Sequence, residues 1–337
     1  MQEEAAPAAE AFAAVILGYV GRGTVDLGRL LPFYTDVLGL ELHEVEPPGS
    51  ASPDVAWLKL PPHARLRLSQ RGDASLCAAT PVYAPTLDPL ALRRGHHLAF
   101  RVADIARAAA VLTRRGLPFE TQLVPTDNPA GGSTQLFLFD PDGNGVELAD
   151  FPAALPHFEQ PEADARLAQA HADVADARGA AAGAHFAAAG AEFGAGSVGV
   201  LSLPVDHRAL ECRSWEAATA FYTDVLGLRP LERPAFRWGG CWLFLPPFEL
   251  HTQEADVAIQ LREGPWSAAG RVEPNWEAEA EAHHLCLQVP CLDAAEAALA
   301  AANPPCASRR VAHGRLVCFD REGNCIVLAR KEDSDVD

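Results

Sequence analysis

An internal repeat constrains the fold of this chain more than any other feature of its sequence. The segment Phe33–Leu40 (FYTDVLGL) recurs without change as Phe221–Leu228. Two further blocks recur in the same order: GHHLAFRV (95–102) as AHHLCLQV (282–289), and FDPDGNGVEL (139–148) as FDREGNCIVL (319–328). Three matched blocks in one order indicate a duplicated domain, because chance similarity does not preserve order.

Each copy divides again into two units of the same pattern, a strand, a helix and two or three strands. The first unit is predicted to have a strand at 15–21, a helix at 27–38 and strands at 55–60 and 64–70; the second has a strand at 97–102, a helix at 105–115 and strands that end at 148. The units near 199–264 and 282–330 follow the same order. The fold class is therefore α+β, with four βαβββ modules.

The modules predict a division of the chain into five segments. We expect a disordered leader (1–13), a first domain (14–150), a helical Ala-rich linker (151–195), a second domain (196–331) and an acidic tail (332–337). Each domain contains two modules.

Charge and cysteine content narrow the partners and the compartment. A formal charge of −18 disfavours nucleic acid and anionic membranes as partners. No apolar run approaches the roughly 20 residues that span a bilayer, and no signal peptide is visible at the N-terminus. The eight cysteines form no CxxC pair, which favours reduced thiols and a reducing compartment, the cytoplasm or an organellar stroma. The expected partner is a small molecule. The sequence leaves the oligomeric state open, and the fold does not require a dimer.

A helix that closes on FYTDVLGL and a partner module that ends in DPDGNGVEL resemble the vicinal-oxygen-chelate superfamily of glyoxalases, bleomycin-resistance proteins and extradiol dioxygenases. The resemblance covers about 15–150 and 199–330. It implies that βαβββ modules pair into curved mixed sheets around a cavity, two such sheets in this chain. It also implies that metal ligands come from the first and last strand of each module. It leaves the reaction open, because the superfamily includes several reactions and metal-free binders.

The first-strand ligand positions implied by the resemblance contain three histidines and a tyrosine. The family's histidine lies fourteen residues before the Phe of the FY pair, which places Tyr19 and His207 there in the first and third modules. The second and fourth modules place His97 and His284 there. The histidine just before each of the latter two is expected to face away, since adjacent strand residues point to opposite faces.

The last-strand positions contain one clear ligand. Glu147 lies between apolar residues on a predicted strand, so its carboxylate faces a cavity or solvent. The equivalent position in the fourth module is Val327, which cannot bind a metal. The first and third modules offer Arg67 and Gln260.

The sequence leaves two pairings of the modules open. Pairing within each half gives two incomplete ligand sets, one with Tyr19, Arg67, His97 and Glu147 and the other with His207, Gln260, His284 and Val327. Pairing across the halves brings His97, Glu147, His207 and Gln260 to one site, and leaves Tyr19, Arg67, His284 and Val327 in a second. We favour the crossed pairing, because it gathers every good ligand in one site.

Two imidazoles and a carboxylate with open positions suit a divalent ion, Zn, Ni, Fe, Mn or Co. The resemblance then implies that two neighbouring substrate oxygens bind the metal, with Glu147 as the catalytic group that moves a proton. Our first hypothesis is a glyoxalase I-like isomerase or lyase that acts on a small vicinal-oxygen substrate such as a hemithioacetal. The alternatives are a binding or scaffold protein without a metal, and an extradiol-type dioxygenase. The remaining histidines are expected at the surface: His43, His63, His157, His171, His185, His251 and His313.

Overall fold

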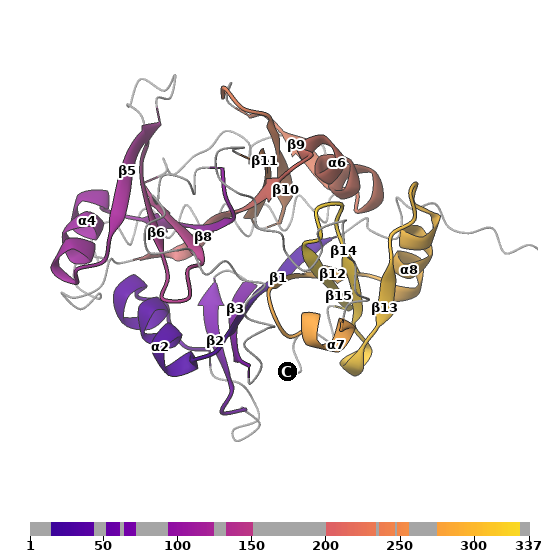
Figure 1. Cartoon of the computed structure of the whole chain (residues 1–337), viewed down its shortest axis with the longest axis horizontal. Coiled ribbons are helices and arrows are strands. Elements are labelled where there is room, and N and C mark those ends of the chain that lie inside the picture. Colours follow the sequence, from indigo (N-terminus) through magenta and orange to yellow (C-terminus); the bar gives the residue numbers. More distant parts are fainter. Residues whose placement is uncertain are drawn as a thin grey trace, which may run out of the picture.

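The computed structural model describes residues 15–43, 52–60, 64–71, 94–124, 133–150, 200–233, 236–246, 248–255 and 275–330. It has the predicted α+β fold, with two mixed sheets of seven and eight strands (Figure 1). The expected leader, linker and acidic tail lie outside the described residues. Within them, no helix is both long and apolar enough to span a bilayer.

Sheet A is formed by the first and fourth modules. Its strand order is β13 (Ser308–Arg310), β14 (Leu316–Phe319), β15 (Cys325–Arg330), β12 (His284–Val289), β1 (Ile16–Thr24), β3 (Ala64–Gln70) and β2 (Val55–Leu60). The two modules meet where β1 pairs antiparallel with β12.

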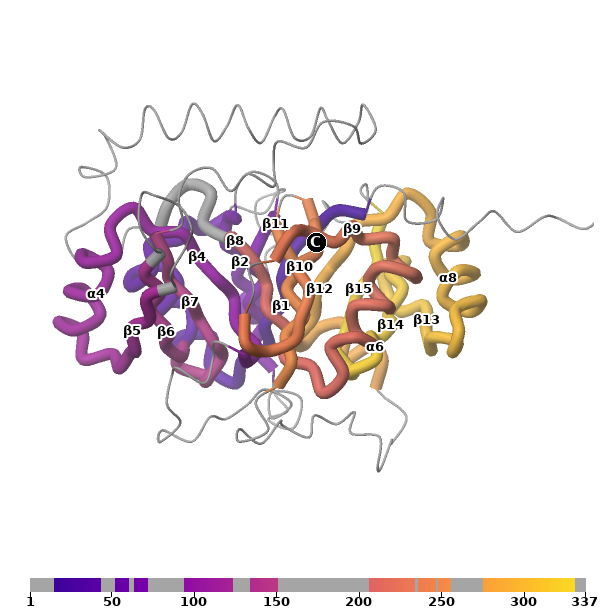
Figure 2. The backbone as a smooth tube through the Cα atoms, turned by 90° about the horizontal axis from the view of Figure 1, so that it is seen from above, coloured from indigo at the N-terminus to yellow at the C-terminus, as the bar shows by residue number. Residues whose placement is uncertain are grey.

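Sheet B is formed by the second and third modules. Its strand order is β5 (Phe119–Val124), β6 (Ser133–Phe139), β7 (Gly145–Ala149), β4 (His97–Val102), β8 (Val200–Cys212), β11 (Phe248–Glu254), β10 (Gly240–Leu245) and β9 (Arg229–Leu231). Here β4 pairs antiparallel with β8. Strands from opposite halves of the chain therefore lie side by side in both sheets, as the colours of Figure 2 show. This is the crossed pairing, and the pairing within halves does not occur.

The helices begin and end at residues whose chemistry explains the boundary. Helix α2 (Leu27–Pro32) is capped by the side chain of Asp26 and continues as a π-helical segment, η1 (Phe33–Leu38), up to Gly39 at φ 89°. A positive φ favours glycine, because it has no Cβ to clash. The repeat has the same plan in α6 (Trp215–Ala220) and η4 (Phe221–Val225).

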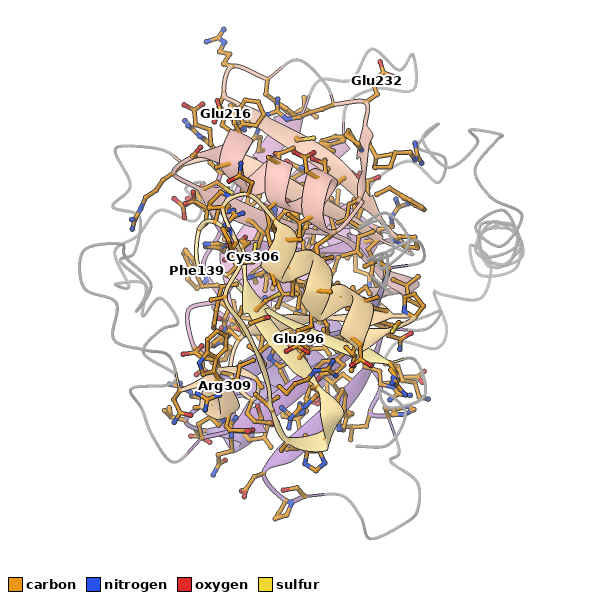
Figure 3. All side chains as sticks on the ribbon, turned by 90° about the vertical axis from the view of Figure 1, so that its right-hand side faces the viewer. Phe139, Glu216, Glu232, Glu296, Cys306 and Arg309 are labelled. Atoms are coloured by element: carbon orange, nitrogen blue, oxygen red, sulfur yellow. The ribbon has the colours of Figure 1, made fainter. Side chains whose placement is uncertain are left out.

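The other helical segments are α4 (Ile105–Arg114), α7 (Trp276–Glu279), α8 (Leu292–Ala301) and η5 (Ala312–Gly314). Helices α2 and α8 contact sheet A, while α4 and α6 contact sheet B. Figure 3 shows α6, which carries Glu216, and α8, which carries Glu296, on the same outer side of the molecule.

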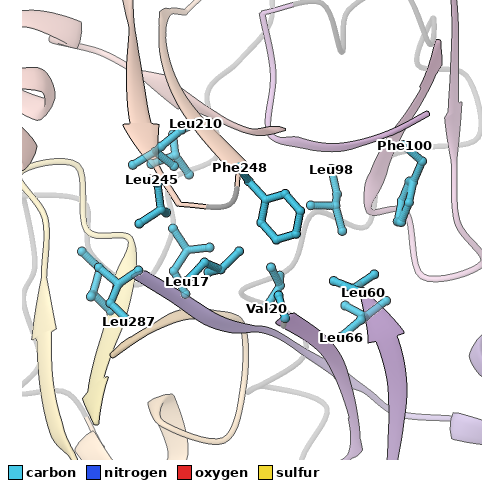
Figure 4. Packing of buried hydrophobic residues seen from close by; sticks show 14 of the residues in the cluster. Leu17, Val20, Leu60, Leu66, Leu98, Phe100, Leu210, Leu245, Phe248 and Leu287 are labelled. Atoms are coloured by element: carbon cyan, nitrogen blue, oxygen red, sulfur yellow. The ribbon is translucent and has the colours of Figure 1, made fainter. Parts of the chain in front are cut away.

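The apolar core lies between the sheets and beneath the helices. Along β4, Leu98 and Phe100 are fully buried in this core, whereas His97 lies on the opposite face of the strand. Figure 4 shows Leu17 and other side chains of sheet A facing Leu98 and Phe248 of sheet B. The alternation of each strand thus assigns one face to packing and leaves the other face for polar groups.

The duplicated sequence blocks contact one another. The Tyr34 hydroxyl, from the FY motif, donates to Asp140 of the DPDGN turn at 2.8 Å. In the second copy Tyr222 donates to Asp320 at 2.9 Å. In each pair the tyrosine precedes strands of one sheet and the aspartate precedes a strand of the other. These buried hydrogen bonds therefore connect the sheets, which explains why both blocks recur together.

Candidate metal centre

Three neighbouring strands of sheet B bring His97, Glu147 and His207 together. On β4, Ala99 pairs with Glu147 of β7 on one side and with His207 of β8 on the other. His97 lies two residues earlier on β4 and so projects from the same face. The three side chains are 1%, 2% and 4% exposed.

The three side chains are close enough to be ligands of one ion. The Nε2 atoms of His97 and His207 are 3.1 Å apart. The Oε2 atom of Glu147 is 3.1 Å from Nε2 of His97 and 3.7 Å from Nε2 of His207. The three potential ligand atoms lie within 4.8 Å of one another, and among the described residues they form the one such group of three.

Each of these groups is oriented by a hydrogen bond from its other end. Nδ1 of His97 donates to the carbonyl of Gly95 at 2.9 Å, and Nδ1 of His207 donates to Asp206 Oδ2 at 3.1 Å. Oε1 of Glu147 accepts a hydrogen bond from Gln135 at 2.7 Å. With both Nδ1 atoms protonated, both Nε2 lone pairs point into the cluster, as metal ligands require.

Electrostatics give the cluster a deficit of positive charge. Burial lowers the pKa of His97, so this imidazole is neutral. Burial alone would also lower the pKa of His207, but its hydrogen bond to Asp206 and the charge of Glu147 raise it above the usual value. Burial would raise the pKa of Asp206, yet Arg101, whose Nε donates to it at 2.7 Å, and His207 hold it below its usual range. Two facing lone pairs and a carboxylate need a proton or a metal cation between them, so the donor set fits a divalent metal.

A further buried histidine beside the cluster, His251, was not anticipated from the sequence. On β7, which pairs with β4, Glu147 lies opposite the residue two positions after His97. On β11, which pairs with β8, His251 lies opposite the residue two positions after His207. The local symmetry of the β4–β8 pair therefore makes His251 equivalent to Glu147. The expectation that His251 is a surface residue is wrong, because it is 4% exposed.

The surroundings of His251 are those of a site residue. Its ring stacks on His207 with ring centroids 3.9 Å apart, and on Trp242 at 4.5 Å. Its Nε2 lies 2.8 Å from a carboxylate oxygen of Glu249, which is 2% exposed. Burial and the nearby charges of His207 and His97 lower the pKa of His251 well below its usual value, so it is a neutral imidazole.

The predicted ligand Gln260 lies outside the described residues. The strand that pairs with β8 is β11, which ends at Glu254. A second short repeat could have corrected the alignment: Leu60-Pro61-Pro62 recurs as Leu245-Pro246-Pro247 just before this strand. Arg67 lies five residues after the first Leu-Pro-Pro segment, and His251 lies four residues after the second. Allowing for this difference of one residue aligns Arg67 with His251.

The equivalent positions in sheet A contain a different set of residues. Arg67 lies opposite the residue two positions after Tyr19, and Val327 lies opposite the residue two positions after His284. The structure thus brings together the four residues that the crossed pairing predicts. The rings of Tyr19 and His284 are in edge contact, with centroids 5.2 Å apart.

Comparison with known proteins supports the fold and the family that the sequence blocks indicate. Residues 16–148 match the profile of the Glyoxalase/Bleomycin resistance protein/Dioxygenase superfamily. A 2-epi-5-epi-valiolone epimerase from Actinomyces sp. is 30% identical over 174 residues, which cover 46% of this chain and 89% of that protein. Glyoxalase I from Zea mays has the same fold, with a TM-score of 0.56 at 14% identity, covering 95% of this chain and 94% of that one. A mutant of that enzyme gives a TM-score of 0.56 at 15% identity.

Proposed function

Because the chain belongs to the glyoxalase/bleomycin resistance protein/dioxygenase superfamily, we propose that it is a metal-dependent enzyme with one active site on sheet B. His97, Glu147 and His207 hold a divalent metal there. The reaction is the transfer of a proton at a carbon next to two neighbouring substrate oxygens, as in an isomerase or epimerase. The observation that carries the proposal is the convergence of three buried, separately oriented donor atoms from distant parts of the chain.

The contacts of the site residues support a separate role for each in the proposed reaction. A bound divalent metal would polarise the substrate oxygens. Glu147 accepts and returns the substrate proton, with Gln135 holding its other oxygen in place. Asp206 and Gly95 keep both imidazoles in the tautomer that leaves Nε2 unprotonated. His251, with Glu249 beside it, stacks on the ring of His207 and supports that imidazole.

The substrate class follows from the chemistry that such a site performs. Two open metal positions suit a small molecule with vicinal oxygens, of which a hemithioacetal is the glyoxalase I-like case. The relative named as a 2-epi-5-epi-valiolone epimerase adds inversion at a carbon beside a ketone as a second case. Both reactions remove and restore one carbon-bound proton, so one catalytic carboxylate serves either.

The test of metal dependence uses two histidines at equivalent positions. Elemental analysis of the purified wild-type protein should find about one equivalent of metal per chain. His97→Ala should lose it, whereas the matched control His284→Ala, on sheet A, should retain it. A wild-type protein that contains no metal, and whose melting temperature does not change with a chelator, would refute the proposal in favour of a non-catalytic binder.

The test of proton transfer uses exchange of substrate protons with deuterated water. Incubation with a hemithioacetal or a cyclic polyol ketone should incorporate deuterium at the carbon beside the oxygens. Glu147→Gln should lower this exchange by about 10²- to 10⁴-fold, the usual contribution of a general base. Exchange that is unaffected in Glu147→Gln would remove this residue from the catalytic role. Failure of every substrate in a protein that does bind metal would refute the substrate class and leave the metal site standing.

A further inference from the structure

The candidate metal centre has an aromatic residue on each side, at equivalent positions of the two modules. Phe137 of β6 pairs with Glu147, and Trp242 of β10 pairs with His251. Phe137 is 1% exposed and contacts His97 edge to face, with ring centroids 5.9 Å apart. Trp242 is only half-buried. The described residues therefore shield this face of sheet B from solvent beside β6 and leave it accessible beside β10.

Ring contacts connect the metal centre to the accessible side. The planes of His207 and His251 differ by 19°, and those of His251 and Trp242 by 6°, so the three rings form one stack. Phe236 contacts Trp242, with ring centroids 6.2 Å apart, and stacks on Trp238 at 4.8 Å. Phe236 and Trp238 are half-buried, as Trp242 is. These three residues, the aromatic wall, offer a flat apolar surface on which part of a ligand can pack.

Arg233 lies against the aromatic wall. Its guanidinium carbon is 4.7 Å from the ring centroid of Phe236, and its Nη2 donates to the carbonyl of Trp238 at 3.0 Å. Its Nε has no hydrogen-bond partner. The arginine is half-buried, so its position is fixed while part of it stays accessible to solvent.

The charge of Arg233 is not neutralised by the described part of the chain. Burial lowers the pKa of this guanidinium, and no carboxylate among the described residues raises it. Arg94 lies over the ring of Trp238 as well, but its donors bind the carbonyls of Glu254 and Ala255 at 2.8 and 2.7 Å. The chain has 45 acidic residues against 27 lysines and arginines, so carboxylates are not scarce. An arginine without one, beside a candidate active site, suggests that its acidic partner is a ligand.

The charge of Arg233 acts on the metal centre itself. Burial is the main cause that lowers the pKa of His251, and the charge of Arg233 lowers it further. Coulomb effects weaken with distance, and Phe236 contacts both Arg233 and Trp242, which stacks on His251. The guanidinium and the stacked imidazole are therefore within the reach of one small molecule.

Building on the proposed function, we propose that Arg233 and the aromatic wall select the substrate of sheet B, a carboxylic acid with a planar or apolar middle part. The carboxylate binds Arg233, the middle part packs on Trp242 and Phe236, and the two vicinal oxygens lie at the metal centre. One guanidinium matches the single charge of a carboxylate better than the roughly double charge of a phosphate at pH 7. The contacts with Phe236 and Trp238 hold the arginine but leave its charge for the substrate.

Calorimetric titration of the full-length protein loaded with Zn²⁺ tests the substrate class with 3,4-dihydroxycinnamate and its amide, without oxygen. Both probes have a planar middle part and two vicinal oxygens, and only the acid carries a charge. The acid should bind about 10-fold more tightly, the worth of a hydrogen bond to a charged group. Equal affinities of the acid and the amide would overturn the proposal.

Variants of Arg233 separate recognition from a structural role. Arg233→Gln should bind the acid and the amide equally, with the affinity for the amide unchanged from wild type. Arg233→Lys should keep the preference for the acid, because it keeps the charge. Arg65→Gln is the matched control and should also keep it, since Arg65 lies 5.9 Å from the ring of Trp57, the sheet A equivalent of Trp242. A preference that persists in Arg233→Gln, or is lost in Arg65→Gln, would exclude the assigned role.

Cinnamate, which lacks the two hydroxyls, distinguishes failure of this proposal from failure of the metal centre. His97→Ala should bind cinnamate as wild type does, because the carboxylate and the ring need no metal. Arg233→Gln should bind cinnamate about 10-fold more weakly than wild type. If the protein holds no metal and this difference remains, the proposed enzyme fails and the arginine site stands. Equal cinnamate affinity in Arg233→Gln and wild type, or no cinnamate binding at tens of millimolar, would refute the arginine site.

Discussion

Replacement of Asp206 by asparagine tests whether the proposed metal centre depends on the orientation of its ligands. Asp206 does not belong to the three-residue cluster, but its Oδ2 accepts from Nδ1 of His207 at 3.1 Å. Its other oxygen accepts from Arg101 at 2.7 Å. Asparagine has the same shape and lacks the charge. When the amide oxygen of asparagine accepts from Arg101, its NH2 group faces Nδ1 of His207, so the candidate ligands stay in place while His207 loses the acceptor that keeps Nδ1 protonated.

The expected magnitude follows from these contacts. Loss of a hydrogen-bonded carboxylate behind a metal-bound histidine typically lowers metal affinity by about 10- to 100-fold. The folded protein should also be less stable, because the guanidinium of Arg101, 6% exposed, loses its charged partner. Removal of one partner of a buried ion pair costs about 3–5 kcal/mol, and the amide oxygen that asparagine retains should reduce this cost.

The assay is a competition titration of metal between the protein and a chromophoric chelator, combined with denaturant unfolding. Asp140→Asn is the matched control, because Asp140 is also buried and bonds an arginine, Arg22, at 2.9 Å, without contacting the cluster. We expect both variants to be less stable and only Asp206→Asn to bind metal more weakly. Equal metal affinity in folded wild-type and Asp206→Asn protein would refute the orienting role.

The remaining predictions concern stability. Leu98 is fully buried between the sheets, so Leu98→Ala should lower the free energy of unfolding by about 2–5 kcal/mol. Leu123 is 64% exposed, so Leu123→Ala should change this free energy by less than about 0.5 kcal/mol. Similar denaturation curves for the two variants would contradict the described core. The pKa of His284 falls from 6.5 to about 3 on folding, so the unfolded chain binds an extra proton and stability should decrease as the pH falls from 6.5 toward 3, with this residue contributing about 1.4 kcal/mol per pH unit. His284→Asn should remove that contribution, and identical pH profiles for the two proteins would show that the histidine is not held neutral.

Much of the fold could be predicted because the repeat carries tertiary information. The FYTDVLGL and DPDGN blocks recur together because the tyrosine of one block hydrogen-bonds the aspartate of the other in each copy. Strand alternation around Glu147 predicted which face of β7 its carboxylate occupies. The convergence of His97 with His207 followed from the resemblance and from the crossed pairing, which the topology confirms.

The place of His251 was not predicted because the third module was aligned to Gln260, nine residues further along the chain and beyond β11, the strand that pairs with β8. The short Leu-Pro-Pro repeat contained the information that would have corrected this alignment. The stacking of His251 between His207 and Trp242 also has no signature in the sequence, since it joins residues on different strands.

The exchange of modules between the halves has a consequence for how this protein can change over generations. Neither half of the chain forms a complete sheet by itself, so neither half can be lost, replaced or moved into another gene as an independent unit. A substitution at the junction of β4 and β8 alters the contributions of both copies at once. Equivalent positions on the two sheets nevertheless carry different residues, Glu147 and His251 on one sheet and Arg67 and Val327 on the other, so each sheet has diverged although both copies contribute to it.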